Sequence, residues 1–336
     1  MGKVGIVAFV LLGLVAASGH CTTDYLYSGP DQRSAQYEGL RPFWHGFESQ
    51  GNPSRDDPYR VKTFEVSGAA LLNVTTPKGN IEIIASEEHE DVTVELYAEQ
   101  GFALWSRSSN LDNYMINLFQ RGNEIIASVE QKGKSSGWSD GVSFNIKIYT
   151  PQSASSELRT MGGHISLKGL KGEQKLRSSG GHLNLADLKG EVKAYTSGGN
   201  IDLTDISGSV LAYTKGGSIH ADRVKGEMRL KTNAGNITGE ELRGYIAAST
   251  SAGNIDVEMA HMERGLSLEA LAGNVSARVP ANTGYNVNMS GTSAEMDFSG
   301  NFSGQKSGNL IQGVINDGGI NINMSSKFGN TTLRLD

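Results

Sequence analysis

Residues that could do chemistry fall into three groups in this sequence. His164 and His182 lie 18 positions apart, and a pair of imidazoles is a common start of a metal site. Asp187 and Asp205 are separated by the same interval, and paired carboxylates carry acid–base chemistry in glycoside-cleaving enzymes. The third group is a set of basic and aromatic residues between 175 and 231, whose side chains suit an anionic or sugar ligand.

Motifs that would turn these groups into an active site are absent from the sequence. There is no HExxH, GxSxG or Walker A loop, and no calcium-binding nonapeptide array. The single cysteine excludes internal disulfides and any CxxC metal or redox site. Two histidines are too few ligands for zinc, and carboxylates are common in turns. We therefore favour structural roles for both pairs and expect no catalytic residue, no metal and no cofactor.

The interval that separates each of these pairs recurs through the middle of the chain. It is marked by a glycine that follows a small residue, at intervals of 18 and finally 20. A fixed period of this size is typical of a solenoid, in which each repeat buries its apolar side chains against its neighbours. We therefore predict an all-β fold, a right-handed parallel β-solenoid (β-helix) with 18-residue rungs. The marker glycines are Gly163, Gly181, Gly199, Gly217, Gly235, Gly253 and Gly273.

Each rung is predicted to hold two strands and two turns. The first strand alternates inward residues such as Ile201 and Leu203 with polar ones, and the second strand does the same with Val210 and Ala212. A threonine column ends the second strand, and we expect its hydroxyls to bond along the column. The marker glycines are expected to turn the chain through positive φ. Parallel coiling would bury a ladder of amides that bond up and down the stack, at Asn200, Asn236, Asn254 and Asn274.

The N-terminus indicates export. Residues 1–20 have the positive start and apolar run of a secretory signal peptide. Ser18-Gly19-His20-Cys21 resembles the lipobox of bacterial lipoproteins, whose cysteine is diacylated, although His20 and Ser18 depart from that pattern. The alternative is ordinary cleavage before His20, which leaves Cys21 as a free thiol. We expect lipidation at Cys21 and a location in the cell envelope, on the outer membrane or the cell surface.

The rest of the chain divides by composition. Residues 21–58 form a polar, turn-rich spacer after the anchor. Residues 59–157 alternate with a period of 2 and predict a strand-rich lead-in. Regular repeats then occupy residues 158–280, and residues 281–336 predict the final rungs and a C-terminal cap.

The outward residues of the second strands predict one basic-aromatic face. Between residues 158 and 235 the chain has 12 Lys or Arg against 7 Asp or Glu, in a protein whose net charge is -6. This face could hold an anionic glycan, lipid headgroups or an envelope protein, or it could simply be solvated and discourage lateral pairing of sheets. The acidic total argues against a nucleic-acid partner, and the oligomeric state is open. The face consists of Lys175, Arg177, Lys193, Tyr195, Tyr213, Arg229 and Lys231.

A strand run that ends at Ile148-Tyr149-Thr150-Pro151, followed by repeated Gly-Gly-Asn-Ile-x-Leu and Leu-x-Gly elements, resembles a group of bacterial adhesin-like families. These are the DUF4097 domain and a related head domain with a Gly-Ile-Asn signature. The likeness covers residues 60 to 336, roughly. It implies a β-helical, envelope-associated and non-enzymatic protein that presents a binding or scaffolding surface. The alternatives are a carbohydrate-active enzyme on a β-helix, either a polysaccharide lyase or a hydrolase, and a self-assembling envelope scaffold.

Overall fold

The computed structural model describes residues 57–100, 111–132 and 142–336, and the structural statements below concern these residues. The predicted signal peptide, Cys21 and nearly all of the spacer lie outside them. The described part consists of strands, with one short 3-10 turn, η2 (Leu111–Asn113). The predicted all-β class is therefore confirmed. No helix of the described residues is long and apolar enough to cross a membrane.

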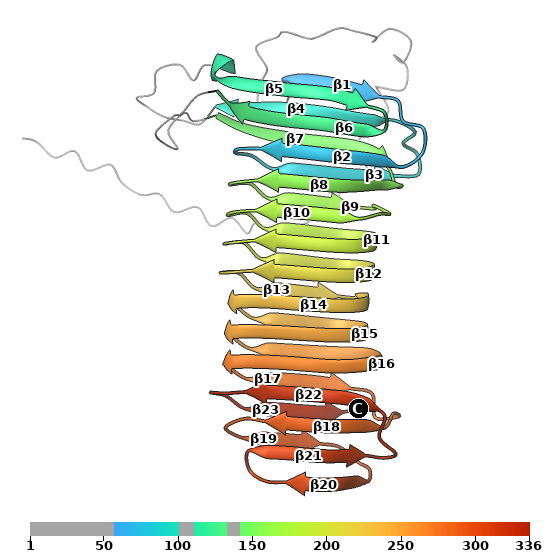
Figure 1. Ribbon diagram of the computed structural model, residues 1–336, viewed down its shortest axis with the longest axis vertical. Helices are drawn as coiled ribbons and strands as arrows, with labels where there is room; N and C mark the ends of the chain where they lie inside the picture. The colour runs from blue at the N-terminus through green and yellow to red at the C-terminus, as the bar shows by residue number, and fades with distance from the viewer. Residues whose placement is uncertain (1–56, 101–110, 133–141) are drawn as a thin grey trace, which may run out of the picture. The chain divides into compact units, whose positions relative to one another are not determined.

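The central strands stack in two layers that face each other (Figure 1). Each repeat supplies one segment to a first sheet, after the marker glycine, and one to a second sheet, before the next marker. β11, β12, β15 and β16 run through the bend and belong to both layers. The strands are β9 (Ile165–Lys168), β10 (Gln174–Ser178), β11 (Leu183–Thr196), β12 (Ile201–Thr214), β13 (Ile219–Asp222), β14 (Lys225–Ala234), β15 (Ile237–Ala252), β16 (Ile255–Ala272) and β17 (Val275–Val279).

Neighbouring segments are parallel, and paired residues lie 18 positions apart. Leu183 pairs with Ile201 in the first sheet, and Val192 pairs with Val210 in the second. The longer interval before Gly273 is absorbed in β16, where the register shifts between the pairs Gly244–Met262 and Tyr245–Gly265. The hand of the coil stays a prediction.

The core lies between the two sheets. Side chains alternate in and out along each strand, so Ile201 and Leu203 from one layer and Val210 and Ala212 from the other belong to one buried core. The inward positions expected from the repeat are buried in the other rungs as well.

Spatial order departs from chain order at the N-terminal end. β2 (Ala70–Thr76) and β3 (Ile81–Ser86) pair in parallel with β8 (Ala154–Thr160) and β9 on one side. On their other side they pair with β6 (Glu124–Gln131) and β7 (Val142–Pro151), which follow them in sequence. The chain therefore leaves the stack after β3, builds further layers beyond it, and returns at β8.

Antiparallel strands close this end. β1 (Arg60–Phe64), β4 (Val92–Gln100) and β5 (Tyr114–Arg121) pair antiparallel with β4, β7 and β6 respectively. Lys62 Nζ donates a hydrogen bond to the carbonyl oxygen of Leu118 at 3.0 Å, which joins β1 to β5. A lysine at an open edge discourages pairing with another strand.

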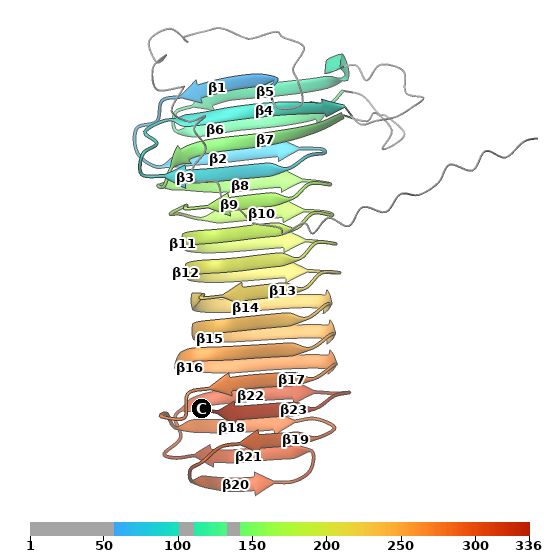
Figure 2. The ribbon, with the colours of Figure 1, turned by 180° about the vertical axis from the view of Figure 1, so that it is seen from behind.

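The C-terminal end is also re-entrant (Figure 2). β22 (Ile320–Ser326) and β23 (Thr331–Leu335) lie between β16 and β17 on one side and β18 (Tyr285–Ser290) and β19 (Ala294–Asp297) on the other. β21 (Leu310–Ile315) pairs antiparallel with β18, and β20 (Phe302–Lys306) pairs antiparallel with β21. The last strands of the chain are thus inserted into the stack and do not end it.

The threonine column does not bond along itself, in contrast to the expectation from the sequence. The buried hydroxyl of Thr214 donates to the carbonyl oxygen of Gly199 at 2.8 Å and accepts from the amide of Gly217 at 3.2 Å. Thr196 makes the equivalent pair of bonds with Gly181 and Gly199. The hydroxyls bond to turn backbone because the turns at Gly199 and Gly217 present a carbonyl and an amide at their height. In the later rungs the turn amide pairs with backbone, as Gly235 does with Ala252, and Thr232 bonds only to the carbonyl oxygen of Gly217.

The marker glycines also need a different explanation. Positive φ holds at Gly235, Gly253 and Gly273 but not at Gly181 or Gly199. What the column shares is close approach of backbone, because a Cβ on Gly199 would lie 2.0 Å from the carbonyl oxygen of Gly181. Only a residue without Cβ fits this distance, whatever its φ.

Gly180 and Gly181 allow a matched test of this packing. A Cβ on Gly181 would lie 1.8 Å from the Gly163 carbonyl oxygen, whereas one on Gly180 would meet its first neighbour at 3.9 Å. We expect Gly181→Ala to lower the free energy of unfolding by about 2 kcal/mol or more, and Gly180→Ala to change it by about 0.5 kcal/mol or less. Urea unfolding followed by far-UV circular dichroism measures both, and equal losses would contradict the close-approach explanation.

Candidate functional site

The two histidines form part of a structural ladder. Their rings are stacked, with centroids 5.0 Å apart and planes 8° apart. His164 Nδ1 accepts the backbone N–H of His182 at 2.9 Å, and His182 Nδ1 accepts that of Asn200 at 2.9 Å. The described residues contain no group of three or more His, Cys, Asp or Glu side chains that could hold a metal ion. The structural role therefore accounts for this pair.

The asparagine ladder is exposed, and the expectation that it would be buried is wrong. Asn200 Oδ1 accepts the backbone N–H of Ser218, and Asn254 Oδ1 accepts that of Asn274, so the bonds join side chain to backbone and not amide to amide. The position directly follows the marker glycine, where the strand has not yet turned inward. One ladder of such bonds runs through Asn145, Asn80, His164, His182, Asn200, Ser218, Asn236, Asn254, Asn274 and Asn330.

The paired carboxylates occupy the opposite turn. Asp187 and Asp205 have φ of 51° and 54°, in a column that continues with Arg223 at 51°. Asp205 accepts two hydrogen bonds from the Arg223 guanidinium, at 2.7 and 3.0 Å. These bonds hold the pKa of the Asp205 carboxyl below its usual value, so it is fixed as an ionised partner and is not poised to carry protons.

The predicted basic-aromatic face lies on the outer side of the second sheet. Its seven residues fall into two neighbouring columns, two positions apart along each strand. The first column contains Lys175, Lys193 and Arg229, with Leu211 between the last two. The second column contains Arg177, Tyr195, Tyr213 and Lys231.

Glutamates neutralise the first column. Glu173 lies 3.0 Å from Lys175 and 3.1 Å from Lys193, and Glu191 lies 2.7 Å from Lys193. Glu227 lies 2.9 Å from Arg229. Hydrogen bonds from Lys175 and Lys193 lower the pKa of Glu173, so this carboxylate stays charged at neutral pH. The first column is therefore a lattice of exposed ion pairs with little free positive charge.

The second column differs because no carboxylate of the described residues lies within 4.0 Å of the Arg177 or Lys231 cations. The Arg177 guanidinium lies 5.0 Å from the centroid of the Tyr195 ring, in a cation–π contact. Lys215, at the adjoining turn, is exposed and also has no such carboxylate partner in the described chain. We name Arg177, Tyr195, Tyr213, Lys215 and Lys231 the turn-side strip.

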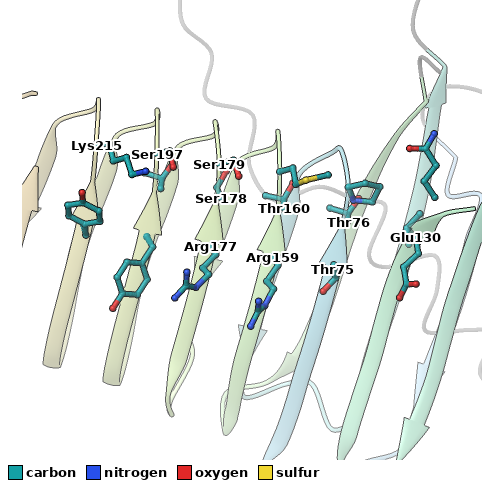
Figure 3. A pocket seen from close by; sticks show the side chains of 17 residues that line it. Thr75, Thr76, Glu130, Arg159, Thr160, Arg177, Ser178, Ser179, Ser197 and Lys215 are labelled. Atoms are coloured by element: carbon teal, nitrogen blue, oxygen red, sulfur yellow. The ribbon is translucent and has the colours of Figure 1, made fainter. Parts of the chain in front are cut away.

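A shallow groove of about 650 Å³ is lined by Arg177, Tyr195, Tyr213 and Lys215 of this strip, whereas Lys231 lies outside its lining. It crosses β6, β2, β8, β10, β11 and β12 near the ends of these strands, so its long direction runs across the rungs. Figure 3 shows the Arg159 and Arg177 side chains side by side on neighbouring strands, with Thr75 on the next strand and Lys215 at the turns. Glu130 lies at the far end of the groove from the strip. The groove joins a basic-aromatic part to an end that carries one carboxylate, Glu130.

Sequence reasoning missed the groove residues that precede the strip. Arg159 continues the Arg177 column one repeat earlier, so extending the 18-residue period backward would have found it. Thr75 pairs with Arg159 only because β2 lies beside β8, and no periodicity in the sequence marks that contact. Lys215 lies two positions after Tyr213, at the turn, and is not among the residues of the predicted face.

Comparison with protein families gives a match for most of the repeat region. Residues 189–334 match the family model described as Toastrack DUF4097. Over these residues the chain is similar to the toastrack DUF4097 domain. The resemblance predicted from the glycine-rich repeats is confirmed over this range. No curated protein matches the sequence.

Solved structures that are similar to the chain are distant. A "putative adhesin" from Bacteroides fragilis is 12% identical, with 82% of this chain and 96% of that chain covered and a TM-score of 0.38. A "putative adhesin" from Parabacteroides merdae is 11% identical, with coverages of 82% and 95% and a TM-score of 0.32. A "putative lipid binding protein" from Parabacteroides distasonis is 11% identical, with coverages of 82% and 97% and a TM-score of 0.36. Similarity this low carries no functional argument for this chain.

The ion pairs of Glu173 predict a pH dependence of stability. Its pKa in the folded protein is below the ordinary value of 4.5, so the ion pairs stabilise the fold above that pH. This stabilisation is lost as the pH falls through the lowered pKa. We expect Glu173→Gln to lower the midpoint of thermal unfolding at pH 7, and the difference from wild type to close below pH ~4.

Glu269 supplies the control for this measurement. It is exposed on the outer side of β16, in the same sheet, and forms no ion pair with another described residue. Glu269→Gln should leave the midpoint of thermal unfolding almost unchanged at both pH values. A Glu173→Gln difference that persists unaltered at pH 3 would contradict the electrostatic explanation.

Proposed function

We propose that this protein is an exported, non-enzymatic protein of the cell envelope that presents the turn-side strip as an adhesin-like binding surface. The observation that carries the proposal is the contrast between the two columns of one face. Lys175 and Lys193 are neutralised by glutamates, whereas no carboxylate of the described chain lies within 4.0 Å of the Arg177 or Lys231 cations. Glu157 is hydrogen-bonded to Arg159 and interacts with Arg177 only at longer range. Free cations beside tyrosine rings in a groove suit an external ligand.

The geometry of the other candidates favours this function over the alternatives. A carbohydrate-active enzyme needs two carboxylates that flank a substrate, but Asp205 is engaged by Arg223. End-to-end assembly needs edge strands that pair with another copy, but a lysine such as Lys62 on the edge strand β1 discourages this pairing. Presentation of a lateral surface requires neither feature.

Export and anchoring complete the proposal. The apolar run within residues 1–20 and the position of Cys21 support cleavage and lipidation at this cysteine. A spacer of polar residues after Cys21 would give the stack reach from the membrane. This arrangement would expose the turn-side strip to ligands outside the cell, at the outer membrane or the cell surface.

The anchor can be tested on the full chain in the producing cell. We expect wild type to incorporate a clickable palmitate analogue and to sediment with membranes, because a diacylated cysteine holds a protein to the bilayer. Cys21→Ser should lose the label and move to the soluble fraction. Unlabelled wild type would overturn the anchor, and Cys21→Ser that stays with membranes would place the attachment elsewhere.

The binding function can be tested on a glycan array with the mature chain. We expect wild type to bind at least one class of envelope or host glycan, and Arg177→Ala/Tyr213→Ala to lose most of that signal because both side chains line the groove. Lys189→Ala, a cation at the opposite turn, is the matched control and should bind as wild type. Silence of wild type across the array would favour a scaffold over this function, and unchanged binding by the double variant would exclude the strip.

A further inference from the structure

We infer that the groove takes a single linear anionic polysaccharide, which lies along the stack with about one sugar on each rung. The inference rests on the proposed function, because it assigns a ligand class to the same surface. It depends on the charge of the strip, the direction of the groove, the spacing of the rungs and the width of the basic region.

Charge comes first. Arg177, Lys215 and Lys231 are exposed cations with no carboxylate of the described residues within 4.0 Å, in a protein whose net charge is -6. Local positive charge of this kind attracts anions although the whole protein repels them. A planar guanidinium such as that of Arg177 also binds a carboxylate or sulfate with two parallel hydrogen bonds.

The groove then sets the direction of the ligand. Its lining residues come from the ends of six successive strands, and few come from the length of any one strand. A chain bound in it must therefore cross the strands and advance along the stack. Tyr195 and Tyr213 lie on adjacent rungs in the same column, so they offer two aromatic rings in succession along that path.

The spacing of the rungs fits a polymer of sugars. Neighbouring strands are about 4.8 Å apart, so the column from Arg177 to Lys231 extends for about 14 Å. An extended chain of pyranose rings advances by a comparable distance per sugar. A chain that extends one rung beyond the groove would thus bring successive sugars to Arg177, the Tyr195 and Tyr213 rings, and Lys231. Its acidic groups would lie at the two ends and its ring faces in the middle.

The basic region is narrow, so it suits a single polymer chain better than a broad ligand such as a membrane. Glu173, Glu191 and Glu227 border the strip on the strand side, where they pair with the first column. An anionic membrane would press against these carboxylates as well as against the cations, which reduces its attraction. A single strand of polymer contacts the turn-side strip alone. Single-stranded nucleic acid shares this shape, and the experiment separates it.

Titration calorimetry of the mature chain tests the inference with acidic and neutral oligomers that share one backbone. The probes are β-1,4-linked glucuronate oligomers of one to eight sugars and the corresponding cello-oligosaccharides, with polygalacturonate, hyaluronan and oligothymidylate as comparisons. We expect the glucuronate oligomers to bind at least about tenfold more tightly than the neutral ones, and less tightly as salt rises. Their affinity should grow with length to about four sugars, one for each rung of the strip, and then level off.

Two variants locate the binding. Arg177→Gln should weaken the acidic oligomer about tenfold or more, because a charge-assisted hydrogen bond is lost. Lys175→Gln is the matched control on the same strand: its cation already pairs with Glu173, and we expect a change of about twofold or less. Circular dichroism establishes that both variants are folded.

The possible failures are distinguishable. Acidic oligomers that bind no better than neutral ones overturn the inference, as does tighter binding of oligothymidylate or an equal loss in Lys175→Gln and Arg177→Gln. Neutral glycans that bind through Tyr213 would preserve the proposed function while removing this ligand class. If the protein binds no glycan and the strip variants change nothing, both the proposed function and this inference are overturned.

Discussion

Close approach of backbone at the marker glycines is the constraint on which the rest of the stack depends. The carbonyl oxygen of Gly181 lies where a Cβ on Gly199 would be, and the same oxygen accepts the hydroxyl of Thr196 at 2.9 Å. Thr196, in the rung that begins at Gly181, and Gly199, at the start of the next rung, therefore both contact the same turn carbonyl. Because this contact recurs in successive rungs, it fixes the register of both sheets. A slip by one residue would turn the whole outer face inward.

The register in turn creates the surface on which function depends. Arg177, Tyr195, Tyr213 and Lys231 form a column only because each is held opposite its counterpart in the next rung. The same register aligns Glu173 and Glu191 with the lysines beside them, which leaves positive charge free on one side of the face only. The regular backbone therefore positions side chains whose charges differ from column to column and from rung to rung.

Much of this could be predicted from sequence because it depends on period and alternation. The marker glycines and the inward positions such as Ile201 and Val210 recur once in each rung. The inward positions are buried, and the glycines lie in close contact with the backbone of the neighbouring turn. The role of Thr214 could not be predicted, because its partners are backbone groups of other rungs. The exposure of Asn200 was missed for a related reason, since a ladder that bonds to backbone does not need to be buried.

At the re-entrant ends, neighbouring strands do not follow the order of the chain, so the 18-residue period could not predict which strands pair. The polar ladder passes from Asn145 to Asn80 and then to His164, an order that the chain itself does not follow. Thr75 reaches the groove through this rearrangement, beside Arg159. Long-range pairing of this kind depends on which edge is free when the strands fold, and that information is not contained in any single repeat.

Position along the stack finally limits where a ligand can bind. Beyond Lys231 the same column continues with Ser249 and Glu269, which have the same geometry but offer no cation. Before Arg159 it continues with Thr75 and Ser128, which are uncharged. The backbone would accept a chain anywhere along this face, since every rung presents the same pleat. Side-chain chemistry alone confines the favourable region to a few rungs. The ligand must therefore be recognised by outward residues that differ between rungs, and not by the glycines and inward residues that recur in every rung.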